Sequence, residues 1–266
     1  TTIGEQAFRA FYLAGPLEIP ANVEIIHDGA FQGTSITNLT FASGSKLEII
    51  GNESFYECRS LTGALEIPAN VVTIGDDAFK SASITSLTFE ANSNLNTIGK
   101  EAFDIYTLVG ALEIPANVVT IEENAFYETA ITSLTFASGS KLETIERLSF
   151  YNCQQLTGSV EIPANVVTIK DSAFDSTAIT GLTFEANSSL ETIGPSAFEF
   201  AESLTGPIVI PGSVTAIGLQ SFAGTAITSI DIPESVTLFG QYVLNVCPNL
   251  NSVIIRGNLS MDSDSL

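Results

Sequence analysis

A repeat of 23 or 24 residues runs through the chain and constrains its fold more than any other feature. Each copy carries an Ala-Phe or Ser-Phe pair, and Leu244 fills the position that follows the last pair. The phenylalanines of these pairs are Phe8, Phe31, Phe55, Phe79, Phe103, Phe126, Phe150, Phe174, Phe198 and Phe222. A unit this short cannot enclose a core alone, so repeats of this kind bury their apolar side chains by stacking on their neighbours. The repeat therefore predicts a solenoid of about 11 coils.

A second marker, an apolar-x-apolar triplet, keeps the same phase from Leu17–Ile19 to Val253–Ile255. Its alternation and its content of Leu, Ile and Phe predict a short strand whose first and third residues face the core. A third marker is a Val-x-x-Ile or Leu-x-x-Ile step, as in Val71–Ile74. In every second copy a proline follows the triplet, as in Ile67-Pro68, and ends the strand because proline cannot donate to a sheet ladder.

The segment before each phenylalanine opens on glycine or on acidic residues, as in Gly75–Phe79. We interpret it as a single helical or 3₁₀ turn, with carboxylates favoured near its N-terminal amides. These acidic residues form a row: Glu5, Asp28, Glu53, Asp76, Asp77, Glu101, Glu122, Glu123, Glu146 and Asp171. The predicted fold class is an α/β-type repeat solenoid, an arc with a parallel β-sheet on its concave face and short or helical turns on its convex face. We expect residues 1–256 to form one domain and residues 257–266 a flexible tail.

Composition narrows the function of the chain. Its 266 residues are 45% hydrophobic and carry a formal net charge of −21. Such acidity argues against nucleic acid and anionic membranes as partners, and the apolar content argues against intrinsic disorder. No apolar run approaches the roughly 18–20 residues needed to span a bilayer, so we expect no membrane insertion. The chain opens in mid-copy on Thr1-Thr2-Ile3 without a secretory signal, and we expect it to be a fragment of a longer protein.

The copies Ala64–Phe79 (ALEIPANVVTIGDDAF) and Ile84–Phe103 (ITSLTFEANSNLNTIGKEAF) resemble the leucine-rich repeat of the BspA-like class. The resemblance extends to about Arg256 and implies a leucine-rich-repeat horseshoe. Proteins of this class are mostly secreted or surface-exposed, and many are thought to be adhesins. The resemblance thus implies an extracellular or cell-surface location and the binding of protein partners. Departures from the pattern include Glu122 and Lys170 in place of the usual glycine.

Nothing in the sequence indicates an active site or a metal or cofactor site. No G-x-S-x-G, phosphate-binding glycine loop, C-x-x-C or H-E-x-x-H motif occurs. The single histidine, His27, is interpreted as an exposed turn residue. Cys58, Cys153 and Cys247 occupy equivalent positions four coils apart, roughly 19 Å in a stacked array, which is beyond disulfide reach. We predict that the cysteines fill the core, and that the protein is not an enzyme.

The middle residue of the strand triplets alternates between glutamate and threonine over the first eight copies, and we predict a ligand-binding surface there: Glu18, Thr40, Glu66, Thr88, Glu113, Thr135, Glu161 and Thr183. Glutamates on every second strand lie roughly 10 Å apart. That spacing is too wide for a shared calcium ion and lies at or beyond the spacing of glycosidase carboxylate pairs. The row would suit a protein with a basic surface or a hydrogen-bonding glycan. The alternative is a solvated sheet face on a structural stalk that presents other domains.

Overall fold

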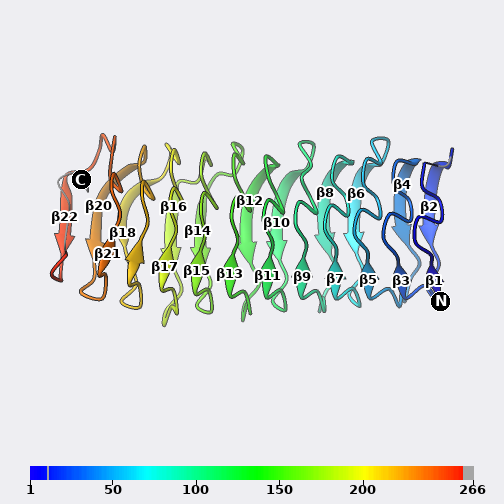
Figure 1. Cartoon of the computed structure of the whole chain (residues 1–266), viewed down its shortest axis with the longest axis horizontal. Coiled ribbons are helices and arrows are strands. Elements are labelled where there is room, and N and C mark those ends of the chain that lie inside the picture. The colour runs from blue at the N-terminus through cyan, green and yellow to red at the C-terminus, as the bar shows by residue number, and fades with distance from the viewer. Residues whose placement is uncertain (11, 260–266) are drawn as a thin grey trace.

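The computed structural model describes residues 1–10 and 12–259 and shows an elongated parallel β-solenoid (Figure 1). One side of it is a continuous eleven-stranded parallel sheet of two-residue strands, formed by the second residue pair of each Val-x-x-Ile type of step. These odd-numbered strands are β1 (Thr2–Ile3), β3 (Ile25–Ile26), β5 (Ile49–Ile50), β7 (Thr73–Ile74), β9 (Thr97–Ile98), β11 (Thr120–Ile121), β13 (Thr144–Ile145), β15 (Thr168–Ile169), β17 (Thr192–Ile193), β19 (Ala216–Ile217) and β21 (Leu238–Phe239).

The apolar-x-apolar triplets form the longer, even-numbered strands, as the alternation predicted. They are β2 (Ala14–Ile19), β4 (Ser35–Phe41), β6 (Thr62–Ile67), β8 (Ser83–Phe89), β10 (Val109–Ile114), β12 (Ala130–Phe136), β14 (Ser159–Ile162), β16 (Gly181–Phe184), β18 (Thr205–Val209), β20 (Ala226–Ile232) and β22 (Ser252–Ile255). We call the surface they form the even-strand face. Its strands pair in twos, β2–β4, β6–β8, β10–β12 and β14–β16, and end in the three-stranded sheet β18–β20–β22.

Two apolar ladders fill the space between the faces. The last isoleucines of strands β3 to β17, such as Ile74 and Ile98, are 0% exposed. The phenylalanines of the repeat stack ring on ring from Phe8 to Phe222, with centroids 5.1 to 5.4 Å apart and nearly parallel planes. Centroid separations in this range are typical of favourable aromatic pairs. The two ladders together form a core that is continuous along the solenoid and built from the same positions of each coil.

The segments around these phenylalanines are turns, and the prediction of helical or 3₁₀ turns was wrong. Residues 1–10 and 12–259 contain no helix. Asn124 and Glu128, which flank Phe126, have φ angles of 57° and 53°, outside the helical region. The amides of Asn124, Phe126 and Glu128 donate to carbonyls of the next coil, at 3.1, 2.9 and 2.8 Å. Hydrogen bonds between coils have replaced the i to i−4 bonds that a helix would need.

The carboxylates of the acidic row therefore do not interact with a helix dipole. Part of it instead bonds main-chain amides of the following coil. Asp28 Oδ1 accepts from the Asn52 amide, Asn52 Oδ1 from the Asp76 amide, and Asp76 Oδ1 from the Lys100 amide, each at 2.8 Å. These side chains link successive turns in the direction of the solenoid axis.

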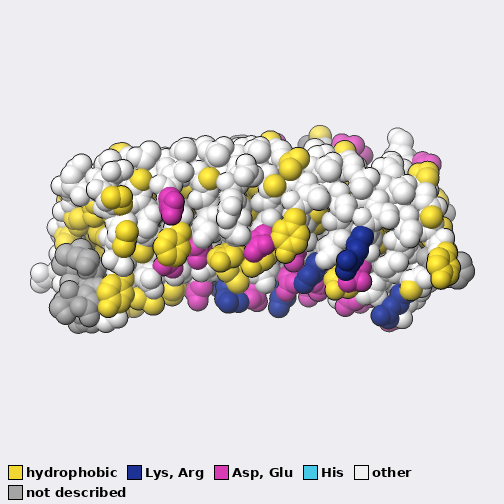
Figure 2. Space-filling model, turned by 90° about the horizontal axis from the view of Figure 1, so that it is seen from above, with side chains coloured by type: hydrophobic (Ala, Val, Ile, Leu, Met, Phe, Trp, Pro, Cys, Tyr) yellow, Lys and Arg dark blue, Asp and Glu magenta, His cyan; other side chains and the backbone are white. Residues whose placement is uncertain are grey.

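Figures 1 and 2 view the molecule from perpendicular directions, and in both the array is nearly straight. The expected arc with a concave sheet is not evident, so the predicted ligand-binding row lies on a straight face. The continuous odd-numbered sheet and the stacked phenylalanine rings give two parts of the coil a similar spacing between coils, which leaves little curvature. The expectation of a domain over residues 1–256 and a tail over 257–266 stays a prediction, because residues 260–266 lie outside the described part.

Candidate functional site

The structure places the eight predicted site residues in one row along the even-strand face. All eight are exposed, whereas Leu65 and Ile67, on either side of Glu66, are buried at 2% and 0%. Each glutamate pairs in register with a threonine of the next strand: Glu18 with Thr40, Glu66 with Thr88, Glu113 with Thr135, and Glu161 with Thr183. The predicted side of the strands is therefore confirmed, and a role in binding stays a prediction.

A seam separates each pair of strands from the next. β8 pairs with β6, and β10 pairs with β12, but β8 and β10 share no ladder although they are neighbours in the stack. In that seam the Thr107 hydroxyl donates to the Ile84 carbonyl at 2.9 Å, a side-chain bond where a continuous sheet would have main-chain bonds. The seam places Thr88 and Glu113 on opposite sides of a discontinuity in the sheet.

A groove of about 770 Å³ lies over this seam and brings three of the predicted residues together. Its floor consists of Thr88 on β8, Glu113 on β10 and Thr135 on β12, with small side chains such as Ala111 between them. Two loops wall it, residues 90–94 after β8 and 115–117 after β10. A volume in this range is typical of sites for small ligands or short segments of a partner. The other five predicted residues lie outside this groove.

Some polar groups of the groove already form hydrogen bonds within the chain, and others do not. Glu90 Oε2 accepts the Ala69 amide at 2.9 Å, and Asn117 donates to the Ser93 carbonyl at 2.8 Å while accepting from Lys141 Nζ at 2.8 Å. These contacts fix the walls. Within the described residues the Glu113 carboxylate forms no hydrogen bond or ion pair. Glu113 is thus an exposed acceptor between two loops that hydrogen bonds hold in place.

The sequence analysis missed the walls of the groove and one aromatic side chain in it. Phe89, the third residue of its triplet, was expected to face the core, yet it is only half-buried and lines the groove. Loop 90–94 begins with glutamate and loop 115–117 with proline. The alternation between long loops, of the Glu-Ala-Asn or Ala-Ser-Gly type, and short Pro-Ala-Asn loops was visible in the sequence. It could have indicated a place where two unlike loops enclose a hollow.

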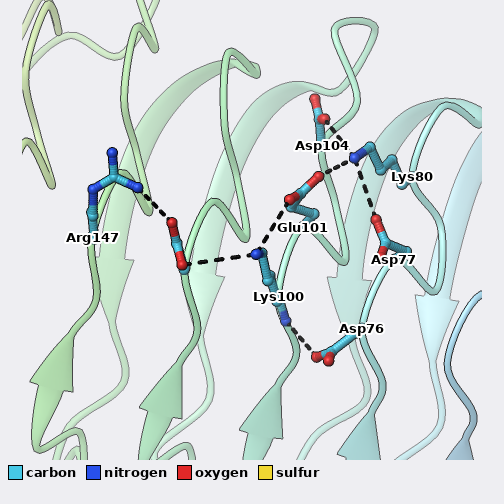
Figure 3. Close-up of polar contacts among 8 residues, drawn as sticks. Asp76, Asp77, Lys80, Lys100, Glu101, Asp104 and Arg147 are labelled. Atoms are coloured by element: carbon cyan, nitrogen blue, oxygen red, sulfur yellow. Dashed lines mark hydrogen bonds and ion pairs between the residues drawn. The ribbon is translucent and has the colours of Figure 1, made fainter.

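A charge network occupies the turns instead of the even-strand face (Figure 3). Lys80 reaches Glu101 and lies 3.4 Å from Asp77 and 3.9 Å from Asp104. Glu123 joins the next coils, because it bonds Arg147 at 2.6 Å and lies 3.9 Å from Lys100. Figure 2 shows basic side chains among acidic ones along one edge of the face it presents. In this network basic side chains pair with some carboxylates of the turns, whereas the glutamates of the even-strand face have no basic partner within the described residues.

Burial shifts the acidity of this network. Asp104 is only 16% exposed, and its desolvation raises the pKa of the carboxyl to about 6, against the opposing pull of Lys80. Burial lowers the pKa of Lys80, but its bond to Glu101 and the charge of Asp77 outweigh this and bring the pKa to about 12. Among the described residues no group of three or more His, Cys, Asp or Glu side chains is placed to hold a metal ion. The network is an ion-pair cluster that joins neighbouring coils.

The cysteines and the histidine lie largely where the sequence placed them. Cys58 and Cys153 are 0% exposed, and all three cysteines are free thiols. Cys247, in contrast, is only partly buried. His27 is exposed in the turn after β3. The described residues include no helix long and apolar enough to cross a membrane.

The glutamate and threonine row ends at the last coils. Val209, at the next position of the row, is 64% exposed, and Ile254 at its end is 46% exposed. Between them Asp231 binds Arg256 through two hydrogen bonds of 2.7 and 2.6 Å. These bonds hold the pKa of Asp231 below its ordinary range. Among the described residues of the row on the even-strand face, the carboxylates without a partner therefore lie on the strands from β2 to β16.

This architecture, a parallel solenoid whose apolar side chains stack from coil to coil, is that of a repeat protein. A family model described as "BspA type Leucine rich repeat region" matches the chain in overlapping segments, residues 1–104, 41–157, 73–205 and 168–265. The matches span the whole of the repeat. The chain belongs to the BspA-type leucine-rich-repeat family.

Solved structures share the fold at low sequence identity. A leucine-rich cell surface protein from Faecalibacterium prausnitzii A2-165 is 22% identical with a TM-score of 0.54, over 100% of this chain and 84% of that one. The pneumococcal vaccine antigen PcpA is 19% identical with a TM-score of 0.53, over 100% of this chain and 76% of that one. Identities this low show the fold alone. No curated protein sequence matches the chain.

Proposed function

We propose that this chain is a non-enzymatic protein-binding module of a secreted or cell-surface protein, and that it binds through the even-strand face. The observation that carries the proposal is the row of glutamates and threonines, exposed and in register over four strand pairs. A rigid array of carboxylates and hydroxyls is complementary to a basic surface. Charge complementarity of this kind steers association and selects among partners.

The distribution of charge supports this face over the turns. Six of the nine basic side chains pair with carboxylates within the chain, and five of those pairs lie at turns. Only the pair between Arg256 and Asp231 lies on the even-strand face. A basic partner would therefore meet carboxylates without an internal cation on that face, whereas at the turns part of the acidic row, such as Asp77, Glu101 and Glu123, already has one. The resemblance to surface proteins supports an extracellular or cell-surface location for the parent protein.

The test compares two triple variants that remove the same charge. Glu66→Gln, Glu113→Gln and Glu161→Gln together remove three of the four carboxylates of the row. The control, Glu48→Gln, Glu143→Gln and Glu191→Gln, removes three exposed carboxylates that precede odd-numbered strands on another side of the coil. Immobilised fibronectin, laminin and the basic protein cytochrome c serve as probes in biolayer interferometry at about 150 mM salt.

We expect the row variant to weaken binding of at least one probe about tenfold or more, and the control variant to change it less than about twofold. Equal losses in both variants would indicate a nonspecific response to net charge. Absence of binding by the native protein to every probe would count against the proposal. Circular dichroism and thermal unfolding of each variant show that the fold is retained.

A second candidate function is a stalk that presents other domains. The observation that favours it is the straight array with an unbroken stack of phenylalanine rings. Small-angle scattering of a longer chain that includes the neighbouring regions tests it. A stalk should stay extended, and the triple substitution of the row should leave the function of the presented domain unchanged.

A further inference from the structure

We propose that the groove over β8, β10 and β12 receives an arginine side chain of the partner, with its guanidinium group against Glu113. This inference rests on the proposed function and names the chemical group that the even-strand face recognises. Three features support it: the charge of the groove lining, the spread of its acceptors over three strands, and the break in the sheet beneath it.

The first step is the charge of the groove. Its lining includes the carboxylates of Glu90 and Glu113 and contains no lysine, arginine or histidine. An anionic ligand would be repelled there, and a cation would be attracted. Glu90 is held by the Ala69 amide through one oxygen, whereas Glu113 forms no bond within the described part of the chain. The cation would therefore be centred on Glu113.

The second step distinguishes arginine from lysine. Acceptors in the groove are spread across three strands, with hydroxyls of Thr88 and Thr135 on the strands that flank Glu113. A guanidinium group carries five donors in one plane and can bond several separated acceptors at once, whereas an ammonium group acts as a point charge. Phe89 also lines the groove and is only half-buried. Guanidinium groups stack on aromatic rings more often than ammonium groups do.

The third step is the seam beneath the groove. Because β8 and β10 share no ladder, their main chains are not bonded to one another as neighbouring strands in a sheet. The small side chains of Ala111 and Ala137 leave room for the aliphatic stem of an arginine, and apolar contact with that stem adds to binding. A neutral glycan would not use the negative charge of the groove.

The test uses short peptides whose central residue alone differs. Acetylated, amidated Gly-Thr-Arg-Thr-Gly is titrated into the protein at about 50 mM salt, followed by NMR chemical shifts. Parallel titrations replace the arginine by citrulline, its neutral isostere, or by lysine. We expect the arginine peptide to bind at least about tenfold more tightly than the citrulline peptide and about threefold more tightly than the lysine peptide. Shifts should concentrate on groove residues such as Ala111 and Thr135.

Single variants locate the site. Glu113→Gln should weaken binding of the arginine peptide about tenfold, and the matched control Glu143→Gln, which changes an exposed carboxylate outside the even-strand face, less than about twofold. Equal affinity for the arginine and citrulline peptides would overturn the inference. So would equal losses in the two variants, which would indicate a response to net charge alone, whereas the proposed function of the row is tested separately by the triple variants. Binding of the neutral disaccharide cellobiose in the groove of both native protein and Glu113→Gln, without arginine binding, would replace it by a glycan site.

Discussion

The Cys153 thiol lies 3.2 Å from the Thr129 hydroxyl and 3.3 Å from the Phe126 carbonyl, so that one coil bonds the turn of the coil before it. The same arrangement recurs at Cys58 with Thr34 and at Cys247 with Thr225. Burial raises the pKa of Cys153 to about 12. A thiol in this setting is neutral and shielded, which gives it little reactivity.

We therefore expect unequal labelling of the three thiols. In the native protein Cys247, which is partly exposed, should react with 5,5′-dithiobis(2-nitrobenzoate), while Cys58 and Cys153 react more than about a hundredfold more slowly. All three should react at similar rates in concentrated guanidinium chloride. Fast labelling of Cys153 in the native state would contradict its place in the core, and a Cys247→Ala variant should abolish the fast phase.

Removal of one ring from the phenylalanine column should destabilise the fold strongly. Phe126 is 0% exposed and stacks between Phe103 and Phe150. Phe126→Ala should lower the free energy of unfolding by about 3–5 kcal/mol through loss of burial and the cavity left behind. Phe8, which is 39% exposed and stacks on one ring alone within the described residues, provides the matched control. Urea unfolding should show a smaller loss for Phe8→Ala, and a loss below about 1 kcal/mol for Phe126→Ala would contradict the column.

Asp104 should make stability depend on pH. Burial raises its pKa from 3.8 to about 6, so between these values the folded protein holds a proton that the unfolded chain releases. Stability contributed by this group is therefore greatest below about pH 4 and declines as the pH rises through 6. Asp104→Asn should flatten this part of the profile and raise the free energy of unfolding at pH 7 by about 1–2 kcal/mol.

The measurement is urea unfolding between pH 4 and 8, over which Lys80 stays charged. Asp171→Asn, which changes an exposed carboxylate of the acidic row, is the control and should leave the profile as it is in the native protein. A native-like slope in Asp104→Asn would show that other groups of the network, such as Asp77 and Glu101, carry the dependence.

Successive turns approach one another closely at Gly99. A Cβ atom added at Gly99 would lie 2.5 Å from the Gly75 carbonyl carbon and 2.6 Å from the Asp76 amide nitrogen. Gly99→Ala should thus force the two coils apart, lengthen the bond from the Lys100 amide to Asp76, and cost about 1–3 kcal/mol. Gly4, the same repeat position, has no atom within 4 Å of its added Cβ, and Gly4→Ala should be nearly neutral in thermal unfolding. Equal effects would refute the steric argument.

Several features of the fold could be predicted from the sequence because they depend on local patterns. Alternation within the triplets decides which side chains are buried, and the register of Glu113 with Thr135 follows once identical coils stack. The buried cysteines and the exposed row could be predicted for the same reason. Each of these features is a property of one coil, repeated along the chain.

The groove could not be predicted in that way. It arises because loops 90–94 and 115–117 differ, because the strand pairs leave a seam between β8 and β10, and because Phe89 does not reach full burial. Each of these depends on how two unlike coils meet in space. A pattern along one coil carries no information on that contact.

The sequence by itself determined that this chain is a solenoid, which residues form its core column and which carboxylates it exposes, since a short apolar repeat can be buried in no other way than by stacking. Only the tertiary structure decided the conformation of the turns, the straight shape and the position of the groove. The turns show the physical reason: the amides of Asn124 and Phe126 bond the following coil, and these contacts between coils outweigh the local preference of the acidic segment for a helical turn.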